Sequence, residues 1–206
     1  LAHLSAARFG FPAEKMTCIG VTGTKGKTTT TYMIKAILEA AGKKVGLIGT
    51  AGAVIGDRTY PTMNTTPESY ELQHYFAQMV EEGCEYMVME VSSHALALER
   101  VRGITFRVGA FTNLTRDHLD FHRTMEDYCD AKAQLFRQCE AAVCNGDDPW
   151  TPRLLKDAAC RVMTYAERAE ADLRAEHIAL SADGIAFDAV TETERVPVRV
   201  HIPGGF

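Results

Sequence analysis

A glycine loop between an apolar strand and an amphipathic helix constrains this chain more than any other feature. The loop, GTKGKTTT, runs from Gly23 to Thr30. Before it, Thr17–Val21 is short, apolar and rich in β-branched residues, which predicts a buried strand. After it, Thr29–Ala41 carries apolar residues at helical spacing, and Gly42 is a typical stop signal. A strand, a glycine loop and a Lys-Thr pair at a helix start are the context of a phosphate-binding loop.

The residue types of the loop suit a nucleotide triphosphate. Glycines let backbone N–H groups approach phosphate oxygens, and the helix N-terminus adds partial positive charge. Lys27 is placed to reach the outer phosphates, and the Thr28 hydroxyl to take a magnesium site. The spacing departs from the standard motif, because Val21 stands five residues before Gly26, where a glycine is usual. A glycine turn that caps a helix beside a chance Lys-Thr pair stays open as the alternative.

Composition excludes several classes of protein. A length of 206 residues suits one domain with room for a small appendage. The net charge of −5, without a basic run, argues against a general nucleic-acid-binding surface. No apolar stretch approaches the ~20 residues of a membrane span, and the first residues lack a signal-peptide core. Six cysteines without zinc or C-x-x-C spacing predict reduced thiols in a cytoplasmic protein.

Strand and helix patterns alternate along most of the chain. Besides the first helix, helical spacing predicts helices at Pro67–Glu82 and Thr124–Cys139. The predicted strands are Thr17–Val21, Lys44–Gly49, Tyr86–Glu90, Val108–Thr112, Ala141–Cys144 and Arg161–Thr164. This order predicts an α/β fold with a doubly wound, mostly parallel sheet flanked by helices and ligands at the carboxyl ends of the strands. Looser alternation over Asp172–Arg199 predicts a small antiparallel sheet near the C-terminus.

Polar residues follow several of these strands at the edge that carries the loop. Glu90 closes a predicted strand, where nucleotide-binding α/β proteins hold a second ligand of the phosphate-bound magnesium. An acidic helix cap or a solvated turn is the alternative for Glu90. The run Phe111–His122 gathers two Asp and two His, and His118 could bind a metal through one ring nitrogen. Capping of the next helix stays open for these residues.

Lys132 lies on a predicted helix among apolar neighbours. Tyr128, Leu135 and Phe136 form an apolar stripe at helical spacing, and Lys132 is four residues from both Tyr128 and Phe136. Spacing alone predicts that the Lys132 ammonium extends to solvent.

Taken together, these motifs resemble those of the Mur ligases. The stretch Thr22–Thr29 resembles the phosphate loop of that family, including its missing first glycine. The runs Asn64–Pro67, Met89–Leu96 and Phe111–Asp120 are similar to the MurE type, which adds the third residue to the peptidoglycan stem peptide. The resemblance runs from about Leu4 to Phe206, and several motifs in the right order make it more specific than the loop alone.

The resemblance implies roles for individual residues. It implies ATP phosphate binding by Gly23, Thr24, Lys25, Gly26, Lys27, Thr28 and Thr29, although Lys25 stands where Asn is frequent. It implies one Mg²⁺ on Thr28 and Glu90, and a second on His118 and Lys132, with Lys132 as a carbamate. It implies binding of a UDP-muramoyl-dipeptide by Asn64, Thr65, Thr66, Ser92 and Arg100. The expected catalytic set is Lys27, Glu90, His118 and Lys132, and the Arg100 guanidinium suits an acidic substrate.

The implied reaction is an ATP-dependent amide ligation. A D-glutamate carboxylate of the substrate attacks the γ-phosphorus of ATP, and the amine of a diamino acid, L-lysine or meso-diaminopimelate, then displaces phosphate. The resemblance also implies that residues 1–15 are a linker from a UDP-binding domain and that residues 16–206 are the central ATP-binding domain. We therefore expect little or no ligase activity from these residues alone. We also expect the protein to be a monomer. A folylpolyglutamate or cyanophycin synthetase relative, and a non-catalytic P-loop binding module, are the alternatives.

Overall fold

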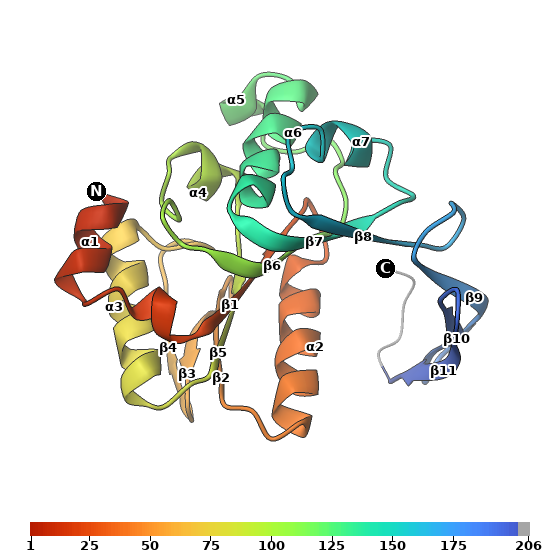
Figure 1. Ribbon diagram of the computed structural model, residues 1–206, viewed down its shortest axis with the longest axis horizontal. Coiled ribbons are helices and arrows are strands. Elements are labelled where there is room, and N and C mark those ends of the chain that lie inside the picture. The colour runs from red at the N-terminus through yellow and green to blue at the C-terminus, as the bar shows by residue number, and fades with distance from the viewer. Residues whose placement is uncertain (202–206) are drawn as a thin grey trace.

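The computed structural model describes residues 1–201, and its strands form one eleven-stranded sheet (Figure 1). The strands are β1 (Thr17–Thr22), β2 (Val45–Gly49), β3 (Gly52–Ile55), β4 (Arg58–Tyr60), β5 (Tyr86–Glu90), β6 (Phe106–Phe111), β7 (Cys139–Asn145), β8 (Arg161–Ala166), β9 (Leu173–Ser181), β10 (Gly184–Val190) and β11 (Arg195–Val200). The α-helices are α1 (Ala2–Arg8), α2 (Lys27–Ala40), α3 (Ser69–Glu81), α4 (Ser93–Ala97), α5 (Leu119–His122), α6 (Met125–Ala133) and α7 (Thr151–Leu154), with 3₁₀ turns at Pro12–Lys15 and Gln134–Arg137.

The centre of the sheet is parallel and doubly wound, as the sequence predicts. The strand order is β11-β10-β9-β8-β7-β6-β1-β5-β2-β3-β4. Strand β1 pairs in parallel with both β5 and β6. The chain leaves β1 through α2 toward β2, and later continues from β6 on the other side, so the winding reverses at β1. Ligands of doubly wound sheets bind at such a reversal, outside the carboxyl ends of the strands.

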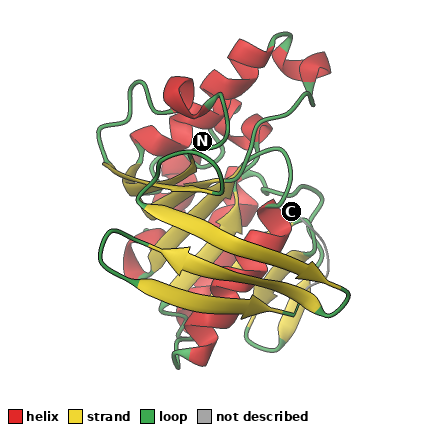
Figure 2. Ribbon diagram, turned by 90° about the vertical axis from the view of Figure 1, so that its right-hand side faces the viewer, coloured by secondary structure: helices red, strands yellow, loops and turns green. Residues whose placement is uncertain are grey.

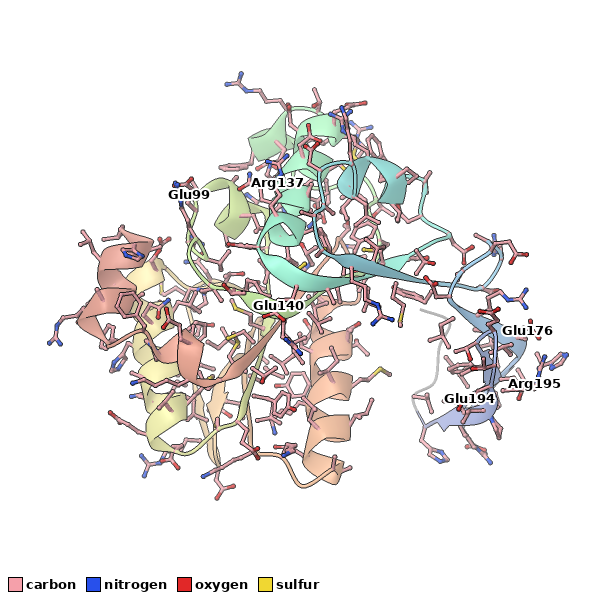
Figure 3. The ribbon with its side chains drawn as sticks, in the orientation of Figure 1. Glu99, Arg137, Glu140, Glu176, Glu194 and Arg195 are labelled. Atoms are coloured by element: carbon pink, nitrogen blue, oxygen red, sulfur yellow. The ribbon has the colours of Figure 1, made fainter. Side chains whose placement is uncertain are left out.

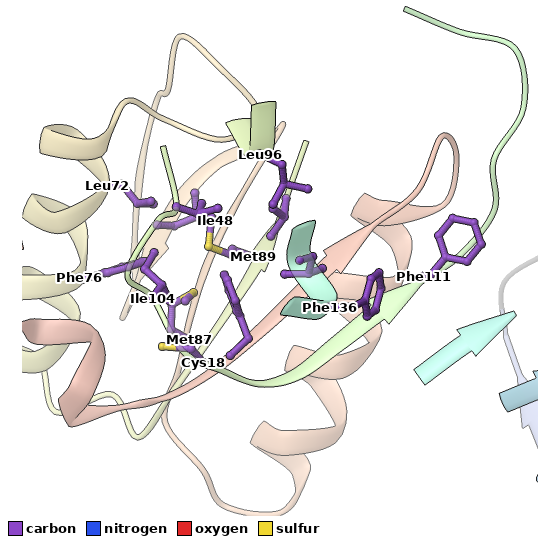
Figure 4. Packing of buried hydrophobic residues seen from close by; sticks show 14 of the residues in the cluster. Cys18, Ile48, Leu72, Phe76, Met87, Met89, Leu96, Ile104, Phe111 and Phe136 are labelled. Carbon is purple, nitrogen blue, oxygen red and sulfur yellow. The ribbon is translucent and has the colours of Figure 1, made fainter. Parts of the chain in front are cut away.

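Apolar side chains from the central strands pack against helices on both faces. On one face, Leu72 and Phe76 of α3 pack against the strand residues Ile48, Met87 and Met89, all fully buried (Figure 4). On the opposite face, α2 packs against β1, β2 and β5. Burial of this size is what orders the strands, because each fully buried apolar side chain contributes roughly 1.5–3 kcal/mol. The same packing fixes the strand ends that carry the polar residues.

The predicted helices are found, with shifted ends. The first begins at Lys27, two residues before the predicted start, because Gly26 takes a left-handed conformation (φ 83°) as its N-cap. The third is shorter than predicted, because α6 ends at Ala133 and a 3₁₀ turn continues to Arg137. The sequence analysis missed β3 and β4, which extend the sheet antiparallel beyond β2. Both are short, and a tight turn at Gly56 hides their alternation.

The C-terminal strands β9, β10 and β11 form an antiparallel ribbon (Figure 2). The ribbon is continuous with the main sheet, because β9 pairs in parallel with β8. One of its faces carries ion pairs of Arg195 with Glu176 and Asp188. Arg195 and Glu176 are labelled in Figure 3. The predicted antiparallel sheet is therefore confirmed as an extension of the main one. The central domain predicted from the sequence extends to Phe206, and its last residues, 202–206, lie outside the described part of the chain.

The N-terminal residues 1–15 contain helix α1 and the 3₁₀ turn Pro12–Lys15, both of which contact α3. Helix α1 contacts α3, and the Phe9 ring lies 5.1 Å from the Tyr70 ring and 5.6 Å from the His74 ring. The assignment of residues 1–15 as a linker stays a prediction. All six cysteines are free thiols, as predicted. Between residues 1 and 201, no helix has the length and apolar character needed to cross a bilayer.

Candidate active site

The glycine loop is hydrogen-bonded to the residues that follow β6. Gly23 (φ 149°) leaves no room for a side chain, because a Cβ there would lie 1.9 Å from Thr112 Oγ1. The Thr24 N–H donates to the Asn113 carbonyl at 2.8 Å, and the Lys25 N–H donates to Asn113 Oδ1 at 3.0 Å. Thr112 in turn donates its hydroxyl to the Lys25 carbonyl at 2.7 Å. The two residues after β6 thus fix the shape of the loop that precedes α2.

Two lysine amines converge on one carbonyl inside this loop. Lys27 Nζ and Lys132 Nζ each donate to the Gly23 carbonyl oxygen at 3.0 Å. Burial lowers the pKa of Lys27, while the nearby Glu90 carboxylate opposes that shift. Burial also holds the pKa of Lys132 well below its ordinary value, and the charge of Lys27 lowers it further. Two cations sharing one oxygen repel each other, so this arrangement favours a neutral Lys132 amine.

Lys132 does not extend to solvent, and the prediction from spacing alone is wrong. Its side chain is 1% exposed, and its amine lies 4.5 Å from the centre of the Tyr128 ring. The physical reason is the position of α6, which packs its inward face against the glycine loop rather than against bulk water. Tyr128 donates or accepts a hydrogen bond with Thr24 Oγ1 at 3.2 Å. The tyrosine therefore ties the helix of Lys132 to the loop.

Glu90 is a buried carboxylate at the end of β5, next to the start of α2. It is 1% exposed, and its Oε1 accepts the Thr28 hydroxyl at 2.8 Å and the Thr50 N–H at 2.9 Å. A Cβ on Gly49 would lie 2.3 Å from Glu90 Oε1, so only glycine leaves space for the carboxylate. A carboxylate and a hydroxyl side by side are hard oxygen ligands, which suit Mg²⁺.

A cleft of about 280 Å³ brings together residues from five separate segments. Its lining residues are Lys27, Asn64, Thr65, Ser92, His94, Arg100 and His118. Six of these seven are predicted site residues. Thr66, the remaining predicted contact of the substrate, is fully buried instead. Its hydroxyl donates to the Glu90 carbonyl at 2.9 Å and accepts the Ser92 N–H at 3.0 Å, so it fastens the wall of the cleft.

Arg100 is fixed at the wall of the cleft by groups of this chain. Its Nη1 donates to the Thr66 carbonyl at 3.1 Å, and its Nη2 lies 2.5 Å from Glu68 Oε1. Its buried Nε has no hydrogen-bond partner among the described residues. A guanidinium held in one orientation loses little rotamer freedom when it binds an anion. Glu68 would compete with a substrate carboxylate for the same group.

Two histidines, His94 and His118, line the cleft, and a third, His122, is buried next to His94. The His94 ring lies 5.0 Å from the ring of His118 and 5.4 Å from that of His122. His122 donates or accepts a hydrogen bond with Ser93 Oγ at 2.8 Å, and burial lowers its pKa to about 4. Burial, with a smaller contribution from His118, also lowers the pKa of His94. Within residues 1–201 no three His, Cys, Asp or Glu side chains gather as a metal site.

The sequence analysis missed two residues that shape the site, Thr50 and Tyr128. Thr50 directly follows β2 at the predicted ligand edge, so the rule applied to Glu90 could have found it. Asn113 belongs to the polar run Phe111–His122, which the sequence analysis placed after a strand at this edge, and the structure has it there beside the loop. Tyr128 was placed in an apolar stripe, and nothing in the spacing marks its hydroxyl as a partner of the loop. His94 lies in the run Met89–Leu96 that resembles the family, but the sequence analysis gave it no role of its own, and the structure places it in the lining of the cleft.

The comparisons with known proteins agree with this geometry. Residues 21–206 match the Mur ligase middle domain. The chain belongs to the Mur ligase family. It is similar, at 47% identity over 206 residues, to UDP-N-acetylmuramoyl-L-alanyl-D-glutamate--2,6-diaminopimelate ligase 1 of Clostridium acetobutylicum. That match covers 100% of this chain and 43% of the relative, so the chain spans less than half of the length of that protein.

Solved structures share the fold over nearly the whole chain. A UDP-N-acetylmuramoyl-L-alanyl-D-glutamate--2,6-diaminopimelate ligase has a TM-score of 0.88 at 27% identity, over 98% of this chain and 43% of that one. A Mycobacterium tuberculosis folylpolyglutamate synthase, solved with ADP and AMPPCP, has a TM-score of 0.73 at 15% identity, over 91% of this chain and 50% of that one. The second likeness shows the fold alone. The family assignment from the sequence motifs is confirmed.

Proposed function

We propose that this chain is the central ATP-binding part, residues 16–206, of a cytoplasmic, monomeric ligase of peptidoglycan precursor synthesis. The ligase would add 2,6-diaminopimelate, the amino acid named in its relatives, rather than L-lysine, to UDP-N-acetylmuramoyl-L-alanyl-D-glutamate. One observation carries the proposal. Lys27 and Lys132 meet at the Gly23 carbonyl at one end of a cleft whose walls hold Asn64 and Arg100.

The donor groups near the loop fit a magnesium ion bound to nucleotide phosphates. Thr28 Oγ1 and Glu90 Oε1 are 2.8 Å apart, and Mg²⁺ sites next to phosphates need only one or two protein oxygens. The ion would polarise the phosphoryl oxygens and offset their negative charge. His118, half exposed at the cleft, and Lys132 would hold a second ion on the substrate side.

Lys132 could serve there only after it loses its positive charge. We infer that its neutral amine adds to carbon dioxide, forming an N–C bond and releasing one proton to give a carbamate. The burial that lowers the pKa of Lys132 supplies the neutral amine. The carbamate would also carry a negative charge next to the Lys27 ammonium and so attract it, since the two side chains meet at the same carbonyl. A carbamate oxygen is a carboxylate-like ligand.

The residues of the cleft would then bring two anions together. Lys27 and the loop N–H groups would hold the γ-phosphate, and Arg100, Asn64 and Ser92 would hold the acidic substrate. The substrate carboxylate would attack the γ-phosphorus and form an acyl phosphate with loss of ADP. The amine of the diamino acid would then attack the acyl carbon and release phosphate. Positioning and charge neutralisation supply most of such a rate enhancement.

The test is product formation by the full-length protein. Incubation with ATP, Mg²⁺, UDP-N-acetylmuramoyl-L-alanyl-D-glutamate and diaminopimelate should give the tripeptide product by mass spectrometry. Phosphate release should depend on the dipeptide substrate, and L-lysine should replace diaminopimelate poorly. A folate with glutamate serves as the control for the folylpolyglutamate alternative. Phosphate release that is indifferent to the dipeptide would contradict the proposal, and tripeptide formation by residues 1–206 alone would contradict the expected inactivity of this part.

A further inference from the structure

Thr50 lies between the nucleotide end and the substrate end of the cleft. Its hydroxyl is 3.0 Å from Thr65 Oγ1 and 3.4 Å from Glu90 Oε2. Its main-chain N–H donates to the other carboxylate oxygen of Glu90 at 2.9 Å. Thr65 lines the cleft, whereas Glu90 is buried beside the Thr28 hydroxyl. A chain of oxygen contacts therefore joins the two ends through one side chain.

The carboxylate fixes the direction of the hydrogen bonds in this chain. An ionised carboxylate only accepts, so Thr50 donates its hydroxyl hydrogen to Glu90. A hydroxyl has a single hydrogen, so Thr50 must accept from Thr65. The Thr65 hydroxyl hydrogen then points toward Thr50, and only the lone pairs of Thr65 Oγ1 face a ligand in the cleft. Lone pairs repel an anion.

The contact with Glu90 is the weak member of the chain. At 3.4 Å it is longer than the 3.0 Å contact between Thr50 and Thr65, so it is the contact that a cation on Glu90 breaks first. The free energy of this charge-assisted contact sets the upper limit of the coupling. If a cation engages Glu90, the Thr50 hydroxyl can turn and donate to Thr65. Thr65 can then donate its own hydrogen to an anionic oxygen in the cleft.

We propose that Thr50 is a positioning residue that couples the two binding events. Engagement of Glu90 by a magnesium nucleotide reverses the hydrogen bond between Thr50 and Thr65, and this raises the affinity of the cleft for the anionic substrate. By linkage, the substrate raises the affinity for the nucleotide by the same factor. The inference rests on the proposed function, because it takes Glu90 as a metal ligand and Thr65 as a substrate contact.

The chain offers closely matched variants for a test. Thr50→Val keeps the shape and the main-chain N–H but removes the hydroxyl, whereas Thr50→Ser restores it. Thr62→Val is the control, because the Thr62 hydroxyl contacts only the Gly49 carbonyl, at 3.5 Å, and takes no part in the chain. Thr50 is exposed, so we expect Thr50→Val to leave the melting temperature close to that of the wild type.

The experiment measures binding by calorimetry with the full-length protein. The ligand is UDP-N-acetylmuramoyl-L-alanyl-D-glutamate, with and without Mg²⁺ and a non-hydrolysable ATP analogue. We expect the nucleotide to tighten substrate binding about fivefold or more in the wild type, Thr50→Ser and Thr62→Val. In Thr50→Val nothing holds the Thr65 hydrogen inward, so the substrate alone should bind about as tightly as it binds the wild type with nucleotide present. The coupling factor should then fall to below about twofold, while the affinity for the nucleotide alone changes little.

Three results would overturn the inference. The first is full coupling in Thr50→Val, and the second is an equal loss of both separate affinities together with a lower melting temperature. The third is a wild-type protein that binds both ligands without coupling, which would leave the proposed function intact. A wild-type protein that binds the nucleotide but not the dipeptide substrate would instead overturn the proposed function, and this inference with it.

Discussion

The phosphate-loop region and the C-terminal ribbon of the same sheet are stabilised in different ways. Around the loop, Val21, Val88 and Met89 are completely buried, and buried polar groups such as Glu90 have partners from several elements. In the ribbon, Leu180 is 64% and Val196 is 50% exposed, and the ion pairs lie at the surface. Surface ion pairs contribute little, whereas buried groups are costly to disturb. Substitutions should therefore have large effects near the loop and small ones in the ribbon.

The largest expected effect is a loss of ligase activity without a loss of stability when Lys132 is replaced. Lys132→Met keeps a long side chain but removes a buried amine that lies 3.0 Å from a single carbonyl. We expect ligase activity of the full-length protein to fall about 10²–10³-fold, by analogy with the loss of one charge-stabilising group. The free energy of unfolding should stay unchanged or rise, because a buried polar group has been replaced by an apolar one of similar volume. Steady-state kinetics and urea unfolding measure the two.

The carbamate can be tested with a smaller side chain at the same position. Lys132→Ala should lose activity to a similar extent and regain part of it when short carboxylic acids are added. Lys156→Ala is the control, because Lys156 is exposed just after α7 and does not line the cleft. Full activity of Lys132→Ala at ordinary bicarbonate would contradict the carbamate.

The second prediction compares two glycines, one beside each region. Gly49→Ala should destabilise the fold by about 1–3 kcal/mol and weaken magnesium-dependent nucleotide binding, because its Cβ would lie 2.3 Å from Glu90 Oε1. Gly146→Ala should be close to neutral, since the nearest atom to its Cβ would be the Tyr165 carbonyl at 3.4 Å. Thermal unfolding with and without Mg²⁺ and nucleotide measures both effects. Equal destabilisation by the two variants would contradict the comparison.

The third prediction concerns Asp147, which holds the connection from β8 to the ribbon. Its carboxylate accepts the N–H groups of Glu167, Arg168 and Ala169. Partial burial would raise its pKa, but these donors outweigh burial and lower the pKa below its ordinary 3.8. Asp147→Ala should cost on the order of 1 kcal/mol at neutral pH.

The lowered pKa of Asp147 also sets the pH dependence of that cost. A carboxyl whose pKa is lower in the folded state stabilises the fold above its ordinary pKa and loses this contribution as the pH falls through the folded value. The difference in stability between the wild type and Asp147→Ala should therefore be constant from pH 7 to about 5 and shrink below about 4. Urea unfolding at several pH values measures it. A difference that grows toward low pH would contradict the assignment.

The smallest expected effect lies on the face of the ribbon. Arg195 contacts Glu176 and Asp188, and all three are at the surface. Arg195→Gln should leave the melting temperature unchanged within error at both low and high salt, because water and ions screen such pairs. A clear loss of stability would show that the ribbon is held by its charges after all.

The same contrast decides what could be predicted from the sequence. Thr17–Val21 and Tyr86–Glu90 are apolar because they are buried between layers of helices, so their pattern identified them and placed Glu90 at the ligand edge. The phosphate-binding loop between Gly23 and Thr30 could also be predicted, because the spacing of its glycines and of the Lys-Thr pair reflects the backbone geometry of such a loop. The local sequence pattern was sufficient to predict the position of a residue wherever that position depends on a single strand, helix or loop.

Contacts between distant elements could not be predicted in this way. Spacing alone predicted that Lys132 extends to solvent, because helical spacing does not say what α6 packs against, and the structure places the glycine loop there. Thr50 and Tyr128 make their hydrogen bonds with partners 15 or more residues away in the sequence. The partners of Thr50 are Thr65 and Glu90, and the partner of Tyr128 is Thr24. The β3–β4 hairpin was missed because its strands of 4 and 3 residues are too short to show alternation.

The central claim is that the cleft joins a substrate carboxylate to the γ-phosphate of ATP held by Lys27. The most direct test labels with ¹⁸O the D-glutamate carboxylate that becomes the amide, and analyses the phosphate released by the full-length protein. The account predicts one ¹⁸O atom in each inorganic phosphate, because the carboxylate oxygen bonds to the γ-phosphorus and leaves with it when the amine attacks. Unlabelled phosphate, released while the amide forms, would contradict the account.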